Sequence, residues 1–299
     1  AMSDRHMPVL IVRGERLLLQ VGAHDYILHG PGLGAFSFES DRERIGGIVR
    51  QLYSTKLRRL LEAGRLHEYR RLFAAQWAIL EGVADTWTCD SLRPAPKENA
   101  HPVRSFLELM RFDSPTRHEH GTSAMLLAAC FGDVPVMRAL LELRAAVDCG
   151  ERRDDPAFAI KRGAQPVHWA ALYGHVSAVS FLLDRRAHVD ARDRVGCTPL
   201  MCCAAVKRPG TLQVARVLIE RRADVNARIT IGGARALEMC ANFDAPELAS
   251  LLLESRAVVD RGSGLSGPLH NAAIFDSGIE LCRLLLEAKA PADDPCVPP

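Results

Sequence analysis

A short phrase that recurs at nearly regular spacing is the feature that most constrains how this chain can fold. The phrase reads RAAVD, RAHVD, RADVN, RAVVD and KAPAD, and its first alanine falls at positions 145, 187, 223, 257 and 290. The spacings are therefore 42, 36, 34 and 33 residues. Self-similarity at a period of about 20 to 50 residues is typical of solenoids, in which each unit packs only on its neighbours.

A second block, apolar and rich in small residues, precedes each copy of the phrase. It reads SAMLLAACFGD, QPVHWAALYGH, TPLMCCAAV, RALEMCANFD and GPLHNAAIFD. Paired alanines such as Ala170 and Ala171 let neighbouring helices approach closely, and leucine runs such as 251–253 fill the layer between them. One unit cannot bury its apolar side alone, whereas a stack of five can.

The two blocks together resemble the ankyrin-repeat family, whose unit reads roughly GxTPLHxAAxxGHxxVVxLLLxxGADVNA. The resemblance covers about residues 118–294 and is strongest in the second and third copies. It implies a β-turn followed by two antiparallel helices in each repeat. Thr198 and Pro199 match the residues that start the first helix, where proline misses no amide hydrogen bond. His168 and His270 match the histidine that hydrogen-bonds within the turn, which implies a structural role.

The predicted fold is mainly α, an ankyrin-repeat solenoid preceded by a small α+β or helical N-terminal region. The resemblance places five repeats at about 118–150, 160–192, 193–228, 229–261 and 262–294, followed by a tail at 295–299. Residues 1–90 resemble no family that we recognise; a hairpin of Val9–Val12 with Leu17–Val21 precedes helices, the second of them over 69–80. Residues 91–117 contain a proline-rich linker and a helix over 103–112, which would cap the stack.

The residue before the alanine of the phrase departs from the family pattern in every copy. The family usually has glycine there, because glycine tolerates the left-handed backbone at a helix end. This chain has a basic residue instead: Arg144, Arg186, Arg222, Arg256 and Lys289. Each would cost about 1 kcal/mol in backbone strain, and a cation at a helix C-terminus returns about 0.3 to 1 kcal/mol. Either these residues compensate the helix dipoles, or they form a basic edge that docks an acidic partner.

The resemblance implies that a partner binds in the concave groove and at the β-turn tips. The groove candidates lie near the ends of the first helices: Phe131, Leu172, Tyr173, Phe243, Ile274 and Phe275. The tip candidates are Arg192, Arg194 and Val195. Aromatic and arginine side chains are over-represented among interface hot spots. The alternative for the aromatic residues is that they pack between neighbouring repeats.

Composition and motif spacing favour binding over chemistry. The net charge of +2 gives no bulk attraction to nucleic acid or to acidic membranes, and no apolar run reaches the length of a membrane span. The glycines of 30–34 lack the spacing of a nucleotide-binding loop. Cys203 and Cys240 occupy small-residue slots, which favours packing over metal binding. We therefore expect no catalytic residues, no metal and no cofactor.

These observations predict a monomeric scaffold or adaptor that binds another protein, in the cytoplasm or alternatively in the nucleus. One alternative is a substrate-selecting adaptor of a ubiquitin ligase or kinase complex, and a second makes the N-terminal region an enzyme. The basic segment 56–71 is either a solvated helix face or a site for calmodulin, acidic lipid or nucleic acid. The start Ala1–Met2 suggests either a remnant of cloning or a piece cut from a longer chain.

Overall fold

The computed structural model of this chain resolves two compact units. The first unit comprises residues 1–114, 119–121 and 154–160, and the second comprises 115–118, 122–153 and 161–299. The residues that the structure describes are 9–13, 16–20, 39–74, 102–152, 162–205, 210–230, 232–259, 267–274 and 279–288. The first unit takes in the helix that was expected to cap the stack, and the capping role itself stays a prediction.

The first unit begins with the predicted hairpin. Strands β1 (Val9–Arg13) and β2 (Arg16–Gln20) pair antiparallel, with Val9 opposite Gln20. Helices α2 (Glu39–Glu62) and α3 (Leu66–Ala74) pack on each other around buried aromatic residues such as Tyr53 and Phe73. Gly64, with φ +66°, interrupts the helical backbone between them. Helix α3 begins at Leu66, three residues before the predicted start at residue 69.

Helix α5 (Pro102–Met110) agrees with the helix predicted at 103–112. Its apolar residues Val103, Phe106 and Met110 are buried, at the spacing of one helical face. The predicted linker covers residues 91–102. Its residues 91–101 and the predicted helical residues 75–80 lie outside the described residues, and Pro102 is the first residue of α5.

The described part of the second unit consists of helix pairs, one within each of the five predicted repeat ranges. The pairs are α6 (Ala124–Cys130) with α7 (Val134–Glu142), α8 (Pro166–Leu172) with α9 (Val176–Asp184), α10 (Pro199–Ala204) with α11 (Thr211–Glu220), α12 (Ala236–Phe243) with α13 (Pro246–Glu254), and α14 (Pro268–Ile274) with α15 (Ile279–Glu287).

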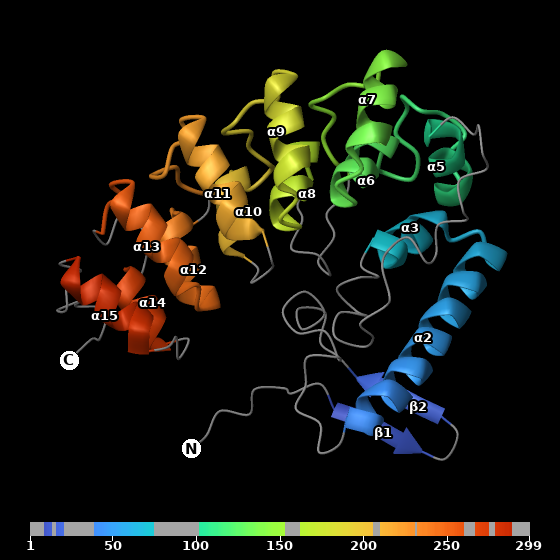
Figure 1. Cartoon of the computed structure of the whole chain (residues 1–299), viewed down its shortest axis with the longest axis horizontal. Helices are drawn as coiled ribbons and strands as arrows, with labels where there is room; N and C mark the ends of the chain where they lie inside the picture. Colours follow the sequence, from blue (N-terminus) through green and yellow to red (C-terminus); the bar gives the residue numbers. More distant parts are fainter. Residues whose placement is uncertain are drawn as a thin grey trace. The chain divides into compact units, whose positions relative to one another are not determined.

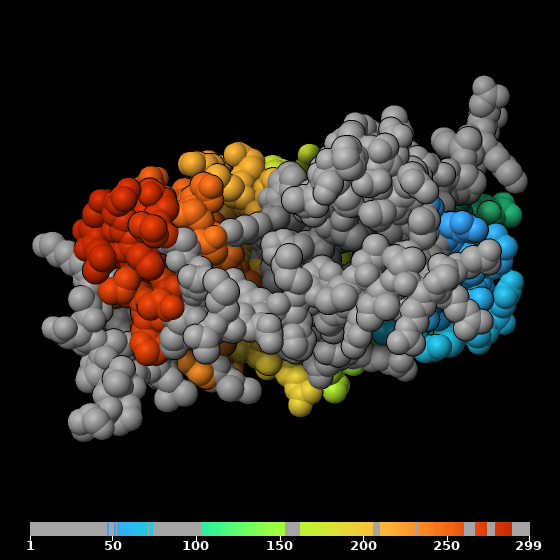
Figure 2. All heavy atoms as spheres, turned by 90° about the horizontal axis from the view of Figure 1, so that it is seen from below, coloured from blue at the N-terminus to red at the C-terminus, as the bar shows by residue number. Residues whose placement is uncertain are grey.

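The pairs stack in chain order, as Figure 1 shows, and form two rows of helices. The first helices contact one another along the series α6, α8, α10, α12 and α14, and the second helices do so along α7, α9, α11, α13 and α15. In the space-filling view of Figure 2 the described atoms of the last repeats form adjoining blocks, red beside orange. The paired alanines Ala170 and Ala171 of α8 are fully buried, which agrees with the close approach of neighbouring helices that their size predicts.

The starts of the first helices agree with the local sequence signals. Thr198 caps α10 by accepting a hydrogen bond from the Met201 N–H at 3.4 Å, and Pro199 is the first helical residue. His168 Nδ1 accepts the N–H of Gln165 at 3.0 Å, and its Nε2 lies 3.1 Å from the Cys197 carbonyl oxygen of the next repeat. The structural role implied for this histidine is confirmed, and the same side chain links two repeats.

Candidate functional site

Two of the groove candidates in the second repeat are buried. Leu172 and Tyr173 are each 3% exposed. The Tyr173 ring stacks on Trp169 at a centroid distance of 6.1 Å and on His175 at 6.3 Å. His175 Nε2 in turn lies 2.8 Å from the Cys130 carbonyl oxygen of the preceding repeat. The expectation that Leu172 and Tyr173 present an open surface is wrong, because neighbouring turns and rings enclose this position.

The remaining groove candidates divide into partly exposed and undescribed residues. Phe131, the C-cap of α6, and Phe243, the last residue of α12, are half-buried. Ile274 is the last residue of α14, and its side chain lies outside the described part, as does the whole of Phe275. Phe131 and Phe243 are thus the groove candidates for which the structure describes accessible side-chain surface.

The basic residues after the second helices adopt the left-handed backbone predicted for them. The φ angles are +65° at Arg144, +67° at Arg186, +66° at Arg222 and +64° at Arg256. In each case two hydrogen bonds close the helix end, as in Arg186 N to Leu183 O at 3.0 Å and Ala187 N to Leu182 O at 3.0 Å. This is the Schellman motif, with the buried alanine of the phrase packed at its last position. Lys289 lies outside the described residues.

Acidic side chains balance the charge of this basic edge. An exposed carboxylate stands two residues before each described arginine: Glu142, Asp184, Glu220 and Glu254. Arg221 pairs with Asp184 of the preceding repeat at 2.9 Å. Arg185 and Arg138 both lie over the Phe181 ring, at 5.3 and 5.2 Å from its centroid. The alternating signs favour dipole compensation and ion pairing over an edge that attracts an acidic partner.

The tip candidates lie on two adjacent β-turn fingers. Finger 1 is the described residues 148–152 and 162–164, and finger 2 is residues 188–196. Arg192 and Arg194 are exposed, and Val195 is half-buried. An open hollow of about 460 Å³, here called the arginine hollow, is lined by Arg162, Gly163, Arg192, Asp193 and Arg194. Arg162 and Gly163 belong to finger 1. The structure therefore places Arg162 beside the predicted tip residues Arg192 and Arg194, which the spacing of the motifs did not indicate.

Backbone hydrogen bonds hold the two fingers together. Within finger 1, Glu151 N donates to Ala164 O at 2.8 Å and Gly163 N to Glu151 O at 2.7 Å. Arg194 N donates to Arg162 O across the fingers at 2.8 Å. Asp193 Oδ1 accepts the N–H groups of Val195 and Cys197 at 3.0 and 2.8 Å. The arginines of the hollow therefore stand on a backbone that is fixed before any partner binds.

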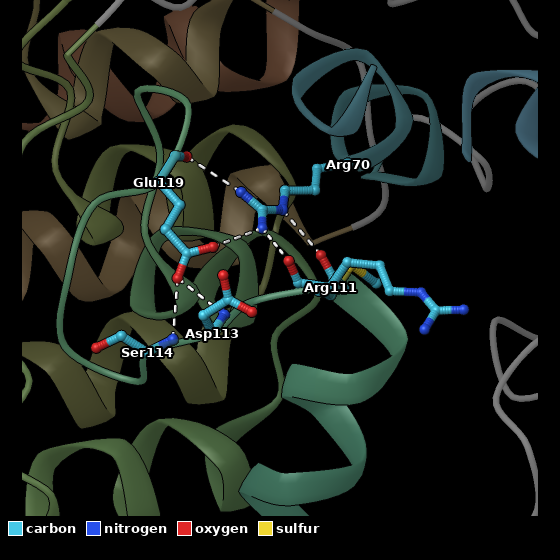
Figure 3. A network of polar contacts seen from close by, with 6 residues as sticks. Arg70, Arg111, Asp113, Ser114 and Glu119 are labelled. Atoms are coloured by element: carbon cyan, nitrogen blue, oxygen red, sulfur yellow. Dashed lines mark hydrogen bonds and ion pairs between the residues drawn. The ribbon is translucent and has the colours of Figure 1, made fainter. Parts of the chain in front are cut away.

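A second polar cluster lies in the first unit around a fully buried arginine (Figure 3). Arg70 of α3 donates to the carbonyl oxygens of Met110 at 2.8 Å, Arg111 and Glu119, the last at 3.1 Å. These donors satisfy carbonyls at the C-terminus of α5 that have no partner within the helix. The guanidinium also stacks on the Phe112 ring, 3.6 Å from its centroid.

Glu119 completes this cluster. Its Oε2 pairs with Arg70 Nη2 at 2.9 Å, while its Oε1 accepts the N–H groups of Asp113 and Ser114, each at 2.9 Å. Burial lowers the pKa of Arg70, and the hydrogen bond to Glu119 opposes that shift. The bonds of Arg70 tie α3 to the end of α5 and to the loop after it, and Glu119 braces that loop, so the cluster has the form of a structural clamp.

The burial of Arg70 removes one charge from the basic segment 56–71. Lys56, Arg58, Arg59 and Arg65 of that segment are exposed, and Arg65 pairs with Glu68 at 2.5 Å. This pattern favours a solvated helix face over a continuous basic binding stripe. The sequence pattern placed Arg70 in the same basic segment as the exposed residues. Its spacing of three residues from Phe73, which is buried, was the signal that Arg70 lies on the buried face of the helix.

The fourth repeat replaces the usual threonine and histidine by a buried charged pair. Arg235 and Glu238 have side chains that are 2% and 4% exposed, and Arg235 N donates to Glu238 Oε2 at 3.0 Å. Arg235 Nη1 also donates to the Val258 carbonyl oxygen at 3.0 Å. Burial raises the pKa of Glu238, against the lowering effect of the Arg235 charge. These contacts lie within the fourth repeat, whereas the bond of His168 to the Cys197 carbonyl joins two repeats.

The thiols of the second unit serve packing. The described cysteines form no disulfide with one another, and burial raises the pKa of Cys149 to about 11 and that of Cys203 and Cys240 further. Within the described residues, no group of three or more His, Cys, Asp or Glu side chains is arranged to hold a metal ion. None of the described helices combines the length and apolar composition needed to cross a membrane.

Comparison with known proteins agrees with this architecture. The family model described as "Ankyrin repeats (3 copies)" matches residues 97–193 and 125–229. Its match begins upstream of the predicted start at about 118 and takes in α5.

Individual relatives match over a similar length. The chain is 39% identical over 92 residues to the ankyrin repeat and KH domain-containing protein mask of Drosophila melanogaster, and 37% identical over 92 residues to the human ankyrin repeat and KH domain-containing protein 1. Each match covers 30% of this chain but 2% and 4% of those two proteins. The ankyrin repeat-containing protein P1E11.10 of Schizosaccharomyces pombe is 34% identical over 98 residues, which are 32% of this chain and 44% of that protein.

These matches agree with three features of the chain: the repeated phrase, the capped first helices and the sequential stacking of helix pairs. The chain contains ankyrin repeats over about residues 97–229.

Proposed function

We propose that this chain is a protein-interaction module that binds a partner polypeptide through its β-turn fingers and carries out no catalysis of its own. Ankyrin repeats generally mediate protein–protein interactions. The observation that carries the choice of surface is the exposure of Arg192 and Arg194 on fingers whose backbones are hydrogen-bonded to each other. Loops held on a rigid scaffold are common carriers of recognition.

The groove contributes less to this proposal than its sequence pattern suggested. Leu172 and Tyr173 are buried, which leaves Phe131 and Phe243 as half-exposed aromatic candidates in two repeats that are not neighbours. A hot spot needs a cluster of such side chains at the centre of a contact. The finger surface has that continuity, since residues of two successive repeats line one hollow.

The test is affinity capture from a lysate of the source cell with four forms of the full chain. The finger variant is Arg192→Glu with Arg194→Glu, and the groove variant is Phe131→Ala with Phe243→Ala. Proteins captured by the wild type should be lost with the finger variant and retained with the groove variant. Leu286→Ala, at a side chain that is 51% exposed, is the control for substitution of an exposed residue.

Circular dichroism establishes that each variant keeps its helical content. Loss of the captured proteins with the groove variant alone would move the binding surface to the first-helix ends. Capture of the same proteins by every form would contradict both surfaces. Copurification of ligase or kinase components would favour the alternative function, a substrate-selecting adaptor. No contact among the described residues supports that alternative at present.

A further inference from the structure

Two thiols of the third repeat, besides packing, lie side by side at the start of α10. The Sγ atoms of Cys197 and Cys202 are 4.0 Å apart. Thr198 is the N-cap of the helix, so Cys197 stands directly before the cap and Cys202 is the fourth helical residue. Side chains at these two positions often pack on each other across the first turn, usually as a pair of apolar residues. Here both positions are occupied by cysteine.

The paired thiols are particular to this repeat. In the three other repeats whose N-caps the structure describes, the two positions are Thr122 with Leu127, Ala164 with Trp169, and Ala234 with Met239. None of these six residues is a cysteine. The repeat pattern therefore requires contact at these positions and does not require sulfur.

The contacts of the neighbouring thiol show which cysteine faces Cys197. Cys203 is 1% exposed, and its Sγ donates to the carbonyl oxygens of Pro199 at 3.5 Å and Ala171 at 3.9 Å. Cys202 is 8% exposed, and its Sγ is directed at the Cys197 Sγ. Cys203 is thus engaged with the backbone, whereas Cys202 is placed to react with Cys197.

The two thiols of the pair differ in their surroundings. Cys197 is half-buried and Cys202 is buried, so a small reagent reaches Cys197 first. The hydrogen bond to Cys197 and burial raise the pKa of Cys202, which keeps its proton at neutral pH. A more accessible thiol that reacts first, with a second thiol poised beside it, is the arrangement of a two-step oxidation site.

The backbone around Cys197 is fixed, so the approach of the sulfurs depends on the side chains. Cys197 N donates to Asp193 Oδ1 at 2.8 Å, and its carbonyl oxygen accepts the Asp193 N–H at 3.1 Å. His168 Nε2 lies 3.1 Å from the same carbonyl oxygen. A disulfide needs the two sulfurs about 2 Å closer than they are. Closing that gap joins the turn of finger 2 to the first turn of α10.

We propose that Cys197 and Cys202 are a site of reversible oxidation, at which a small hydroperoxide converts the two thiols to a disulfide. Cys197 loses its proton and attacks the hydroperoxide. The O–O bond breaks, Cys197 becomes a sulfenic acid, and the departing oxygen takes up that proton. Cys202 Sγ then attacks Cys197 Sγ, the S–S bond forms, and the sulfenic hydroxyl leaves as water with the proton of Cys202.

The reverse step needs a thiol reductant such as glutathione. Two equivalents restore both protein thiols by exchange and leave as their own disulfide. The proposal concerns the chemistry of α10 and finger 2, and it does not require that the fingers bind a partner.

The test exposes the folded full chain to hydrogen peroxide and reads each cysteine by mass spectrometry. Thiols that remain are blocked in urea with one alkylating reagent, disulfides are reduced, and the thiols released are labelled with a heavier form of the reagent. All three cysteines of this repeat fall on the tryptic peptide 195–207, whose fragment ions separate them. Cys197 and Cys202 should carry the heavy label, at least about tenfold more than Cys203. Dithiothreitol added before the blocking step should abolish it.

The unfolded chain is the control for geometry. In urea, Cys202 and Cys203 stand at nearly the same distance along the chain from Cys197, so loop closure favours neither. Peroxide should then label Cys202 and Cys203 within about twofold of each other. The selectivity for Cys202 in the folded chain thus measures the contribution of the structure.

Variants identify the role of each thiol. Cys202→Ala should form no disulfide and should accumulate the Cys197 sulfenic acid, which dimedone traps at least about tenfold more than in the wild type. Cys203→Ala is the matched control at the adjacent position and should keep the disulfide. Circular dichroism checks that both variants fold, and Cys202→Ser replaces Cys202→Ala if the alanine variant unfolds.

Three results would overturn the proposal: no heavy label at Cys197 and Cys202, equal labelling of Cys202 and Cys203 in the folded chain, or a Cys197 disulfide that persists in Cys202→Ala. None of them bears on the capture of a partner by Arg192 and Arg194. Conversely, a chain that captures no lysate protein would still form the disulfide, so the two proposals fail separately.

Discussion

Arg186 holds a backbone conformation that favours glycine, with φ +67°. In this conformation its Cβ destabilises the fold by about 1 kcal/mol. Its charge near the helix C-terminus stabilises the fold by about 0.3 to 1 kcal/mol. Two substitutions distinguish the strain caused by the Cβ from the effect of the charge. Arg186→Gly should be more stable than Arg186→Ala by about 1 kcal/mol in urea unfolding, because both lose the charge and only glycine loses the Cβ.

The control reverses the sign. Arg216 is exposed within α11, where glycine is less stable than alanine by about 1 kcal/mol. Arg216→Gly should therefore unfold more easily than Arg216→Ala. The same order of stability at positions 186 and 216 would show that the left-handed backbone at Arg186 carries no strain.

His168 makes stability depend on pH. Burial lowers its pKa below the ordinary 6.5, against the raising effect of its bond to Cys197. The unfolded chain therefore takes up a proton at this ring first as the pH falls, and folding stability decreases between pH 6.5 and the lower folded pKa. The urea midpoint should fall from pH 7.5 to 5.5, and less so in His168→Gln. His118, whose pKa burial also lowers, accounts for part of the slope that remains.

At the scale of elements, the turns between paired helices set how closely repeats stack. Gly210, with φ +89°, starts α11, and a Cβ on it would meet the Gly174 carbonyl oxygen of the preceding repeat well inside contact distance. Gly232 has a similar φ of +83°, and a Cβ there would meet nothing within 4 Å. Both alanine variants incur the left-handed strain, and only Gly210→Ala adds a clash with backbone.

Gly210→Ala should therefore lower the free energy of unfolding by about 1 to 3 kcal/mol more than Gly232→Ala does. Differential scanning calorimetry of the two variants measures this difference. Equal losses would mean that neighbouring repeats separate enough at the turn to admit a methyl group without cost.

Arg70 clamps elements of the first unit. Arg70→Ala should destabilise that unit by about 3 to 5 kcal/mol, because Glu119 would lose its buried partner and the carbonyls of Met110 and Arg111 would lose their donor. Hydrogen exchange of the α5 amides should rise accordingly. Arg65→Ala removes an exposed pair with Glu68 on the same helix and should cost about 1 kcal/mol or less. Unchanged α5 protection in Arg70→Ala would contradict the clamp.

At the scale of the whole molecule, each described helix pair packs on the neighbouring pairs in chain order. We therefore expect a destabilising substitution to affect mainly its own repeat and the adjacent one. Leu285 of α15 is fully buried, and Leu285→Ala should cost about 2 to 5 kcal/mol in the last repeat. Hydrogen exchange should accelerate in α14 and α15 and stay unchanged in α8. Leu286→Ala, at the adjacent exposed position, should leave all of these rates unaltered. Faster exchange throughout the stack would indicate global cooperativity in place of nearest-neighbour coupling.

The sequence by itself determined the features that depend on local backbone chemistry. The repeated phrase located the helix ends, because an alanine after a left-handed residue closes the same pair of hydrogen bonds at each of the four described copies. Thr198 and Pro199 located a helix start, and two short apolar runs on either side of a turn at 13–15 located the hairpin. Such signals act over a few residues, so they survive without knowledge of the surroundings.

Only the tertiary structure decided which side chains face solvent and which residues meet. Tyr173 is buried because His175 and Trp169 enclose its ring, and Arg70 is buried because the end of α5 lies over it. The arginine hollow joins Arg162 to residues about thirty positions later, a proximity that depends on how one repeat stacks on the next. Burial and clustering of this kind are set by neighbours distant in the chain, and a local sequence pattern contains no measure of them.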